Sequence, residues 1–290
     1  MLSKKINKKM IEPYLLVLPA LILIMVFKIY PILYSVIGSF FVKAKGGIIK
    51  FAWFTNYKFL FNDPTFTNSL WVTFKLNIFI TPIQIILGIA MAIYLNRNFK
   101  SVRIARTLIY IPVAINMVVA STIWNMLLSP NQGPINSIFA KFGIAPQPFL
   151  TSPNQALTLI IIICCWKGVA YWMIFLLAGL QNVSPSLYEA GKIDGTNYFQ
   201  ELFFITIPMM KNSLKFVIIS DTMINLFLFV PVYMLTGGGP QGSTDTLMYE
   251  AYRAAFKFAN YGRSYSIVTI LLLITFIIIG IQMHFLKNED

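Results

Sequence analysis

The sequence predicts an all-α protein that crosses a membrane six times, because its apolar residues are too many for a soluble chain and lie in long stretches. Of its 290 residues, 57% are apolar and 11% are charged, whereas about a quarter of the residues in a soluble domain are charged. A helix needs about 20 residues to span the hydrocarbon core of a bilayer. Six stretches are long enough: 13–41, 69–95, 107–128, 156–180, 214–235 and 264–286.

The first stretch follows a cluster of lysines, which gives the N-terminus the charge of a signal peptide. No small-residue cleavage site follows the apolar part, so we expect an uncleaved first helix with a cytoplasmic N-terminus. Lys28 and Pro31 are expected to interrupt this helix. The lysines of the cluster are Lys4, Lys5, Lys8 and Lys9.

Short basic segments set the predicted orientation, since lysine and arginine concentrate in cytoplasmic loops. Segment 96–106 is basic and free of acids, and it is placed in the cytoplasm together with both termini. Its basic residues are Arg97, Lys100, Arg103 and Arg106. The first outer loop, 42–68, argues weakly against this orientation. It contains Lys43, Lys45, Lys50 and Lys58.

The other predicted outer loops are 129–155 and 236–265. The last of them opens with the glycine-rich run 237–240, and Ser243, Thr244 or Asp245 could each serve as the N-cap of a helix after it. The apolar residues that follow recur at helical spacing, which predicts a short amphipathic helix on the outer surface. They are Leu247, Ala251, Ala254, Ala255 and Phe258.

The long inner loop, residues 181–213, is predicted to form two short helices outside the membrane. Ser184 as N-cap and Pro185 at the first helical position predict a helix over 185–194 that stops at Gly195. A second helix fits 197–207 and is expected to end before Pro208. The loop is net acidic, with Glu189, Asp194 and Glu201 against Lys192. Because inner loops are usually basic, we expect this one to face a basic partner.

The inner loop also contains a recognisable motif. It consists of Tyr188, Glu189, Ala190, Gly191, Lys192, Ile193, Asp194 and Gly195, then Phe203, Ile205 and Pro208. This motif resembles the EAA loop of the inner-membrane permease subunits of binding-protein-dependent ABC importers. Two further segments resemble the carbohydrate branch, the relatives of the maltose and glycerol-3-phosphate permeases. They are 166–181, and 236–240 with Ser243, Thr244, Tyr252, Ala255, Phe256 and Gly262 after it.

The resemblance implies a type I ABC importer permease fold in which residues 1–290 form a single transmembrane domain of a sugar importer. It implies that the inner loop couples to a separate cytoplasmic ATPase dimer, which binds ATP and magnesium, while this chain binds no cofactor. A second permease subunit and an extracellular sugar-binding protein would complete the assembly in a bacterial plasma membrane. The residues matching the coupling motif are Tyr188, Glu189, Ala190, Gly191, Asp194, Gly195 and Pro208.

The sequence leaves the roles of three coupling residues open. Glu189 either pairs with a basic residue of the ATPase or is a solvated surface carboxylate. Asp194 either contacts that partner or caps its own turn. Gly191 stands where the family more often has alanine, at a cost of about 1 kcal/mol of helix propensity, so the coupling helix is expected to be softer.

Two predicted spans carry faces suited to a polar substrate. In the fourth, Cys164, Gly168, Tyr171 and Phe175 share one helical face, and the glycine would let a ligand approach the backbone. In the fifth, the shared face contains Asp221, Asn225, Phe229 and Val232. The resemblance implies sugar binding between these helices, at Gly168, Tyr171, Asn225 and Leu228 or Phe229. Helix packing is the alternative for Tyr171 and Phe229, and an interhelical hydrogen bond for Asn225.

Lysines inside predicted spans need partners, because a central charge costs about 2.5–3.5 kcal/mol on insertion scales. Lys75 lies near the outer end of its helix, where its ammonium can reach the interface, and Lys28 could do the same. Lys167 lies near the middle of the fourth span. We expect it to face the bundle and to bind either Asp221 or backbone carbonyl groups.

Other classes of function fit less well. Nucleic acid is excluded as a partner because the basic residues are scattered between apolar stretches. Segment 237–242 formally matches a dinucleotide fingerprint, but no strand precedes it, so neither ATP hydrolysis nor another catalytic site is expected. One histidine and two adjacent cysteines predict no metal site. The alternative function is a stand-alone secondary transporter or channel for a small polar solute, which would need intramembrane carboxylates, and only Asp221 qualifies.

Overall fold

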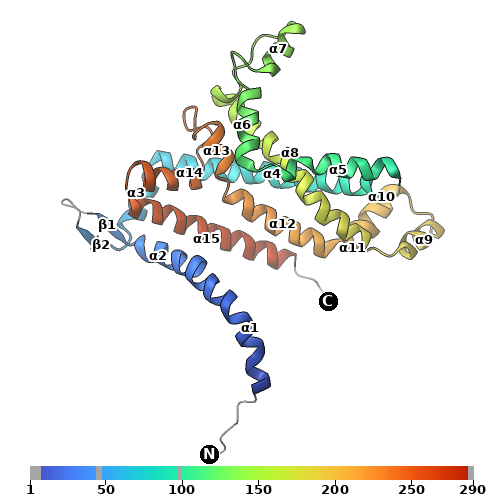
Figure 1. The fold of residues 1–290 in the computed structure, drawn as a ribbon, viewed down its shortest axis with the longest axis horizontal. Coiled ribbons are helices and arrows are strands. Elements are labelled where there is room, and N and C mark those ends of the chain that lie inside the picture. Colours follow the sequence, from blue (N-terminus) through green and yellow to red (C-terminus); the bar gives the residue numbers. More distant parts are fainter. Residues whose placement is uncertain (1–7, 44–47, 97–98, 287–290) are drawn as a thin grey trace, which may run out of the picture. The chain divides into compact units, whose positions relative to one another are not determined.

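The computed structural model describes residues 8–43, 48–96 and 99–286, and this part of the chain is mostly helical (Figure 1). Five of the described helices are long and apolar enough to cross a membrane, or six when one bent pair is counted as a span. The prediction of an all-α polytopic membrane protein is therefore confirmed. Among the residues used to orient the chain, Lys4, Lys5, Lys45, Arg97 and segment 287–290 lie outside the described residues.

The chain divides into two compact units. The first comprises Met1–Asn62 and Ala251–Ile270, and the second comprises Asp63–Glu250 and Leu271–Asp290. The last helix, α15 (Tyr261–Phe285), contributes its beginning to the first unit and its end to the second. The predicted sites all lie in the second unit.

The first unit begins with a long helix. Its parts are α1 (Lys8–Ile24), a π-helical turn (Met25–Ile29) and α2 (Tyr30–Gly38). The expected interruption at Lys28 and Pro31 is a widened turn within a continuous helix, because Pro31 occupies a position in the first turn of α2. The described side chains along residues 14–38 bury little surface within the chain, which leaves this helix available to lipid or another chain.

A small hairpin and a short helix complete the first unit. Strand β1 (Phe41–Lys43) pairs antiparallel with β2 (Ile49–Phe51), and α3 (Thr55–Phe61) follows. Asn56 Nδ2 donates hydrogen bonds to the carbonyl oxygens of Ser39 and Phe41, at 2.8 and 2.9 Å. These bonds attach α3 to the hairpin.

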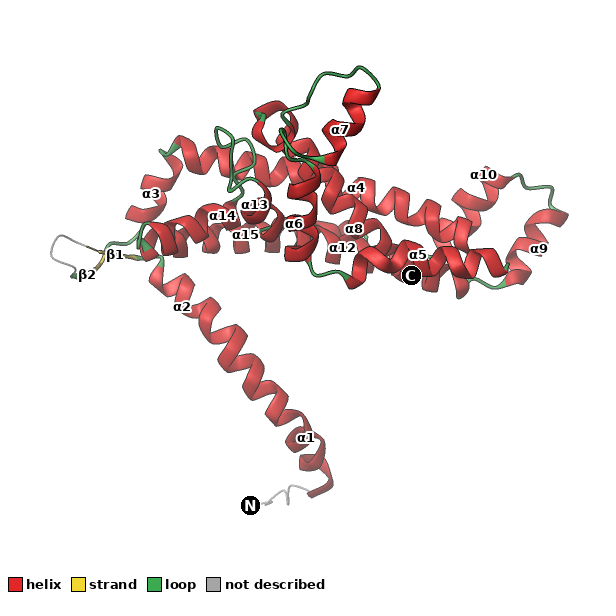
Figure 2. Ribbon diagram, turned by 45° about the horizontal axis from the view of Figure 1, so that its top comes forward, coloured by secondary structure: helices red, strands yellow, loops and turns green. Residues whose placement is uncertain are grey.

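The second unit contains the remaining helices, except that the last two residues of α14 and the π-helical turn after it (Arg253–Lys257) belong to the first unit (Figure 2). They are α4 (Pro64–Leu95), α5 (Lys100–Ala114), α6 (Met117–Leu127), α7 (Pro134–Lys141), α8 (Pro153–Gln181), α9 (Pro185–Ile193), α10 (Tyr198–Gln200), α11 (Ile207–Met209), α12 (Lys211–Leu226), α13 (Val230–Leu235) and α14 (Leu247–Tyr252). A 3₁₀ turn (Phe149–Thr151) precedes α8, and a π-helical turn (Glu201–Thr206) joins α10 to α11.

Helices α4, α8 and α12 form the core of the second unit. Leu76 and Ile80 of α4 and Ile160 and Leu176 of α8 are fully buried, so both helices present apolar faces to the interior. Helix α4 begins five residues before the predicted 69, because Asp63 accepts a hydrogen bond from the Thr65 N–H at 2.8 Å and caps the helix. Helix α8 agrees with the predicted fourth span to within a few residues.

The third predicted span, 107–128, is not one straight helix. Helices α5 and α6 meet at an angle of 94°. Ile115 is extended, with φ −80° and ψ 129°, and Asn116 starts α6 by accepting a hydrogen bond from the Val118 N–H at 2.9 Å. Residues 107–128 therefore belong to a bent pair of helices that can count as one span. The break was not predicted because periodicity reports an apolar face and does not detect a cap within it.

The fifth predicted span, 214–235, is also broken. Helix α12 ends at Leu226, and α13 starts at Val230 with Pro231 in its first turn. The extrapolation of one helical face from Asp221 and Asn225 to Phe229 and Val232 was therefore wrong. The residues between the two helices turn toward a pocket, described below.

The helix after the glycine-rich run is mostly buried, and the prediction of a surface helix was wrong. Helix α14 starts at Leu247, and the preceding Thr246 accepts a hydrogen bond from the Tyr249 N–H at 3.3 Å, so none of the three expected N-caps is used. Leu247 is fully buried, and its N–H donates to Thr73 Oγ1 of α4 at 2.9 Å. Of the predicted apolar face, Phe258 is 66% exposed.

Candidate functional site

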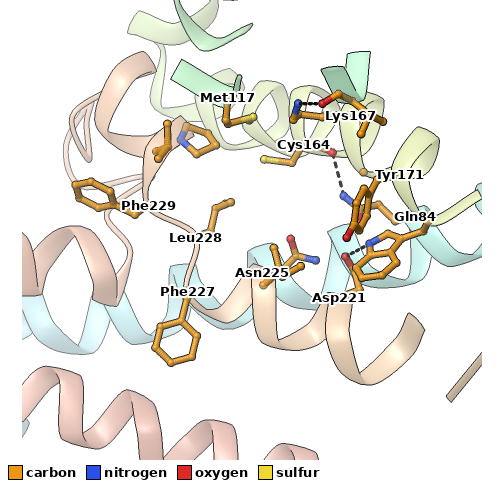
Figure 3. Close-up of a pocket in the computed structure, with 16 residues that line it drawn as sticks. Gln84, Met117, Cys164, Lys167, Tyr171, Asp221, Asn225, Phe227, Leu228 and Phe229 are labelled. Carbon is orange, nitrogen blue, oxygen red and sulfur yellow. Dashed lines mark hydrogen bonds between the residues drawn. The ribbon is translucent and has the colours of Figure 1, made fainter. Parts of the chain in front are cut away.

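The second unit contains a pocket of about 450 Å³ where both broken spans meet the core. Its walls come from α4, from the α5–α6 bend, from α8 and α12, and from the chain between α12 and α13 (Figure 3). Breaks of this kind place backbone polar groups next to a cavity, which is where membrane proteins tolerate irregular backbone. The pocket therefore presents a few polar groups among mostly apolar walls.

The predicted substrate-path residues all line this pocket. They are Gly168, Tyr171, Asn225, Leu228 and Phe229. Cys164 and Asp221 line it too, while Phe175 and Val232, which shared the predicted faces, do not. The structure brings these residues together, and their contact with a substrate stays a prediction.

Gly168 makes room for a side chain of the protein itself. A Cβ atom at this position would lie 2.1 Å from Nε2 of Gln84. That amide instead donates a hydrogen bond to the carbonyl oxygen of Cys164 at 2.9 Å. The Gln84 amide therefore fills the space on the Cβ side of Gly168, while the residue still lines the pocket, and the approach of a ligand to its backbone stays a prediction. The signal in the sequence was an amide within an otherwise apolar stretch.

Replacing Gly168 with alanine is expected to destabilise the protein by about 1–3 kcal/mol, since the new methyl group would displace the Gln84 amide. The Gln84→Ala, Gly168→Ala double variant should recover most of this loss, so that the two effects are not additive. Thermal unfolding of the purified chain in detergent measures both. Gly280→Ala is the matched control, because outside its own stretch of helix backbone no atom of the described residues lies within 4 Å of a Cβ there. Additive effects of the two substitutions would contradict the interpretation.

Lys167 binds backbone carbonyl groups, which confirms one of the two predicted alternatives. Its Nζ donates to the carbonyl oxygens of Pro112 at 2.8 Å and Val113 at 3.3 Å, and also to that of Ile115. These groups lie at the C-terminal end of α5, where a helix leaves carbonyls unpaired and favours a cation. Lys167 thus caps α5 at its bend with α6.

Asp221 lies on the opposite side of the pocket from Lys167 (Figure 3). Its Oδ1 accepts a hydrogen bond from Nε1 of Trp172 at 2.6 Å, and its side chain is 1% exposed. Asn225, one turn further along α12, donates to Thr81 Oγ1 of α4 at 3.1 Å. Asn225 therefore makes an interhelical hydrogen bond, which was the alternative to sugar contact that the sequence left open for this residue. Sequence reasoning missed Trp172, whose apolar neighbours resemble ordinary core.

Aromatic side chains line part of the pocket. Tyr171 is 38% exposed, and its ring lies 4.8 Å from that of Trp172 in an edge-on arrangement. Phe229 stacks on Tyr233, with ring centroids 5.4 Å apart. The packing alternative thus holds for Phe229, although the residue also lines the pocket.

The inner loop lies at the end of α8 away from α6 and α13 (Figure 1). Helix α9 and the left-handed Gly195, with φ +76°, agree with the predicted first helix. Ser184 occupies the N-cap position, but its hydroxyl bonds to Ser186 Oγ at 2.7 Å and not to the helix backbone. Glu189, Ala190 and Asp194 are exposed.

The second helix of the inner loop does not end before Pro208, so that prediction was wrong. Asn197 and Gln200 form a capping box, and the helix continues through the π-helical turn into α11, which contains Pro208. In the wider turn the Ile207 N–H bonds to the carbonyl of Leu202, five residues back. The proline ring therefore avoids the carbonyl that it would meet in a regular α-helix.

Two contacts hold α9 against the π-helical turn. The Tyr188 hydroxyl bonds to Thr206 Oγ1 at 3.0 Å. Gly191 is buried, and a Cβ there would lie 2.9 Å from both Ile205 Cδ1 and Thr196 Oγ1. The glycine that departs from the family pattern thus allows close packing. Among the described residues no hydrogen bond involves the Asp194 carboxylate, so a local cap is not observed.

The outer surface of the inner loop combines acidic and apolar groups. Ile193 is 87% exposed beside Asp194 at the end of α9, and Phe204 is 76% exposed on the π-helical turn. Exposed apolar side chains rimmed by charges are typical of a protein interface. Membrane spans with a pocket at their breaks, together with an exposed acidic and apolar inner loop, are typical of the membrane component of a transporter.

The chain belongs to the family of binding-protein-dependent transport system inner membrane components, whose sequence profile matches residues 84–288. It is 36% identical over 270 residues to the lactose transport system permease protein of Rhizobium radiobacter, covering 90% of each chain. It is 30% identical over 283 residues to the trehalose/maltose transport system permease protein of Thermococcus litoralis, covering 95% of this chain and 94% of that one.

Two further comparisons extend this result. The sn-glycerol-3-phosphate transport system permease protein of Agrobacterium fabrum is 29% identical over 281 residues, with 96% of both chains covered. A crystal structure of a bacterial alginate ABC transporter contains a chain with the same fold. Its TM-score is 0.85 at 21% identity, with 96% of both chains covered. The ABC importer permease fold expected from the inner-loop motif is thus confirmed.

Proposed function

We propose that this chain is a permease subunit of an ATP-driven importer that carries a sugar across a bacterial plasma membrane. The observation that supports this most is the pocket at the two helix breaks, which combines aromatic rings with amide and carboxyl groups. Aromatic faces pack on sugar rings, and amide and carboxyl groups bind hydroxyls. Relatives named for lactose and for trehalose or maltose support the same substrate class.

The inner loop, residues 181–213, couples the pocket to ATP hydrolysis in this proposal. Its acidic and apolar surface suits a groove with basic residues on a cytoplasmic ATPase dimer. Helix α9 is attached to the π-helical turn through Tyr188 and Gly191, and that turn continues through α11 to α12. A movement of α9 would thus reach the pocket wall that carries Asp221 and Asn225.

The importer would work by alternating access within one transmembrane domain, residues 1–290. An extracellular binding protein delivers the sugar, and a second permease subunit supplies the rest of the cavity. The partner ATPase holds ATP and magnesium, and this chain binds no cofactor and catalyses no reaction. Closure of the ATPase dimer opens the pocket outward, and hydrolysis returns it to the inward state.

Affinity purification of the tagged chain from its native membrane tests this proposal. We expect an ATPase and a second multi-span permease to co-purify, and the complex in proteoliposomes to import a sugar only with ATP and the binding protein. The rival function, a stand-alone secondary transporter or channel, predicts transport by the purified chain alone. Solute uptake by that chain without ATP would overturn the importer proposal.

A further inference from the structure

The pocket contains two buried oxygen atoms without hydrogen-bond partners. Among the described residues, neither Gln84 Oε1 nor Asp221 Oδ2 accepts a hydrogen bond. Both residues line the pocket, and their side chains are 3% and 1% exposed. A buried polar atom without a partner is costly, so a donor from a ligand would stabilise both acceptors. The Thr81 hydroxyl and the Asn225 amide also lie beside the Asp221 carboxyl group.

The cationic donor of the described pocket lining is occupied, and each lining amide already makes one hydrogen bond. Lysine has three N–H donors, and the Lys167 ammonium contacts three carbonyl groups at the end of α5. Gln84 Nε2 donates to the Cys164 carbonyl, and Asn225 Nδ2 donates to Thr81. Among the described lining residues Lys167 is the one cation. The described lining of this chain therefore leaves no full positive charge to bind an anionic group.

The remaining charge of the pocket is negative. Asp221 lies across the pocket from Lys167 (Figure 3), and its Oδ1 is held by a neutral indole N–H. A phosphate, sulfonate or carboxylate beside Asp221 would be repelled strongly at low dielectric. A hydroxyl group would instead donate to Oδ2, and a charged acceptor makes the stronger kind of hydrogen bond.

We infer that the pocket selects uncharged, hydroxyl-rich sugars and rejects sugars that carry an anionic group, with Asp221 and Gln84 as the acceptors for sugar hydroxyls. The inference rests on the proposed function as an importer permease. Sequence likeness does not decide this point, because the relatives include systems named for lactose and for sn-glycerol 3-phosphate. Tyr171 and Trp172 would pack against the apolar face of the sugar ring.

The test measures ATP-driven uptake by the complete importer, with its binding protein, in proteoliposomes. The neutral probes are radiolabelled lactose, maltose and trehalose, and the acidic probes are radiolabelled sn-glycerol 3-phosphate and digalacturonate. We expect uptake of at least one neutral sugar and none of the acidic probes above the background without ATP. Asp221→Asn should lower neutral-sugar uptake about tenfold, while its Oδ1 can still accept from Trp172.

Two variants keep the test independent of folding defects. Gln84→Met removes the second acceptor without touching Asp221 and should also lower neutral-sugar uptake. Ser121→Ala is the matched control, because Ser121 Oγ is buried and without a partner among the described residues but lies outside the pocket lining. Its uptake should equal that of the wild type. The amount of each complex in the membrane is measured alongside.

Each other outcome has a defined meaning. Uptake of an acidic probe by the wild type would overturn the inference and leave the sugar-importer function standing. Wild-type uptake of a neutral sugar by both Asp221→Asn and Gln84→Met would also overturn it. ATP-driven uptake of no sugar by the wild-type complex would overturn the proposed function together with the inference.

Discussion

Replacing Glu189 with lysine is expected to reduce ATP-driven uptake by at least tenfold while the chain still folds and inserts. Glu189 is exposed on α9, beside the exposed Ile193 and Asp194, so the substitution disturbs no internal contact. It reverses a charge on the surface proposed to face a basic groove, and like charges across an interface cost several kcal/mol. The measurement is sugar uptake and stimulated ATPase activity of the reconstituted complex.

The control for this variant lies on the same helix. Lys192 is also exposed, and Lys192→Gln makes the loop more acidic without reversing the charge at position 189. Its uptake should remain within about twofold of the wild type, as for most single changes to exposed charges. Coupled turnover of Glu189→Lys at the wild-type rate would show that Glu189 is a solvated carboxylate, the alternative that the sequence left open.

Replacing Lys167 with methionine is expected to lower the free energy of unfolding by at least about 2 kcal/mol and to reduce uptake about tenfold. The change preserves the length and apolar stem of the side chain but leaves the carbonyls of Pro112, Val113 and Ile115 without their cation. Hydrogen bonds to charged groups contribute about 1.5–3 kcal/mol each. Val113 and Met117, which form part of the pocket wall, would no longer be held in place by the Lys167 ammonium.

Lys167→Arg should recover part of the activity, since arginine keeps the charge and several donors. Lys75→Met is the matched control. The Lys75 ammonium lies 5.9 Å from the ring centre of Trp71, and such a contact at an exposed site contributes only about 0.5–1 kcal/mol. Thermal unfolding in detergent and sugar uptake are measured for all three variants. Equal stability and uptake of Lys167→Met and the wild type would refute the capping role.

Sequence periodicity located the long apolar helices but not their breaks. The α5–α6 bend depends on the extended backbone at Ile115 and on the Asn116 cap, and the average hydropathy of a stretch reports neither of these features. At Pro208 the sequence-based prediction failed in the opposite way, because it placed a helix end where the helix continues. Proline normally ends an α-helix, but the π-helical turn before it changes the hydrogen-bond register, and that turn has no signature in the residues alone.

The candidate site was predicted more completely than its internal contacts. Gly168, Tyr171 and Asn225 were identified from spacing and from the family motif, and the structure brings them to one pocket. Gln84 and Trp172 were missed because their partners, Cys164 and Asp221, are 80 and 49 residues away along the chain. No local pattern reports such pairs.

The sequence by itself determined the membrane class, the inner-loop motif and the family resemblance, because long apolar stretches and a local run of residues are properties of adjacent positions. The tertiary structure decided how the charges within the membrane are satisfied. Lys167 binds the end of α5, while Asp221 Oδ2, on the other side of the pocket, accepts no hydrogen bond from the described residues. Whether each charged group finds a partner depends on which helix ends meet in space. Because an unpaired polar group is costly where water is absent, the same contacts determine which ligand groups the pocket is inferred to accept.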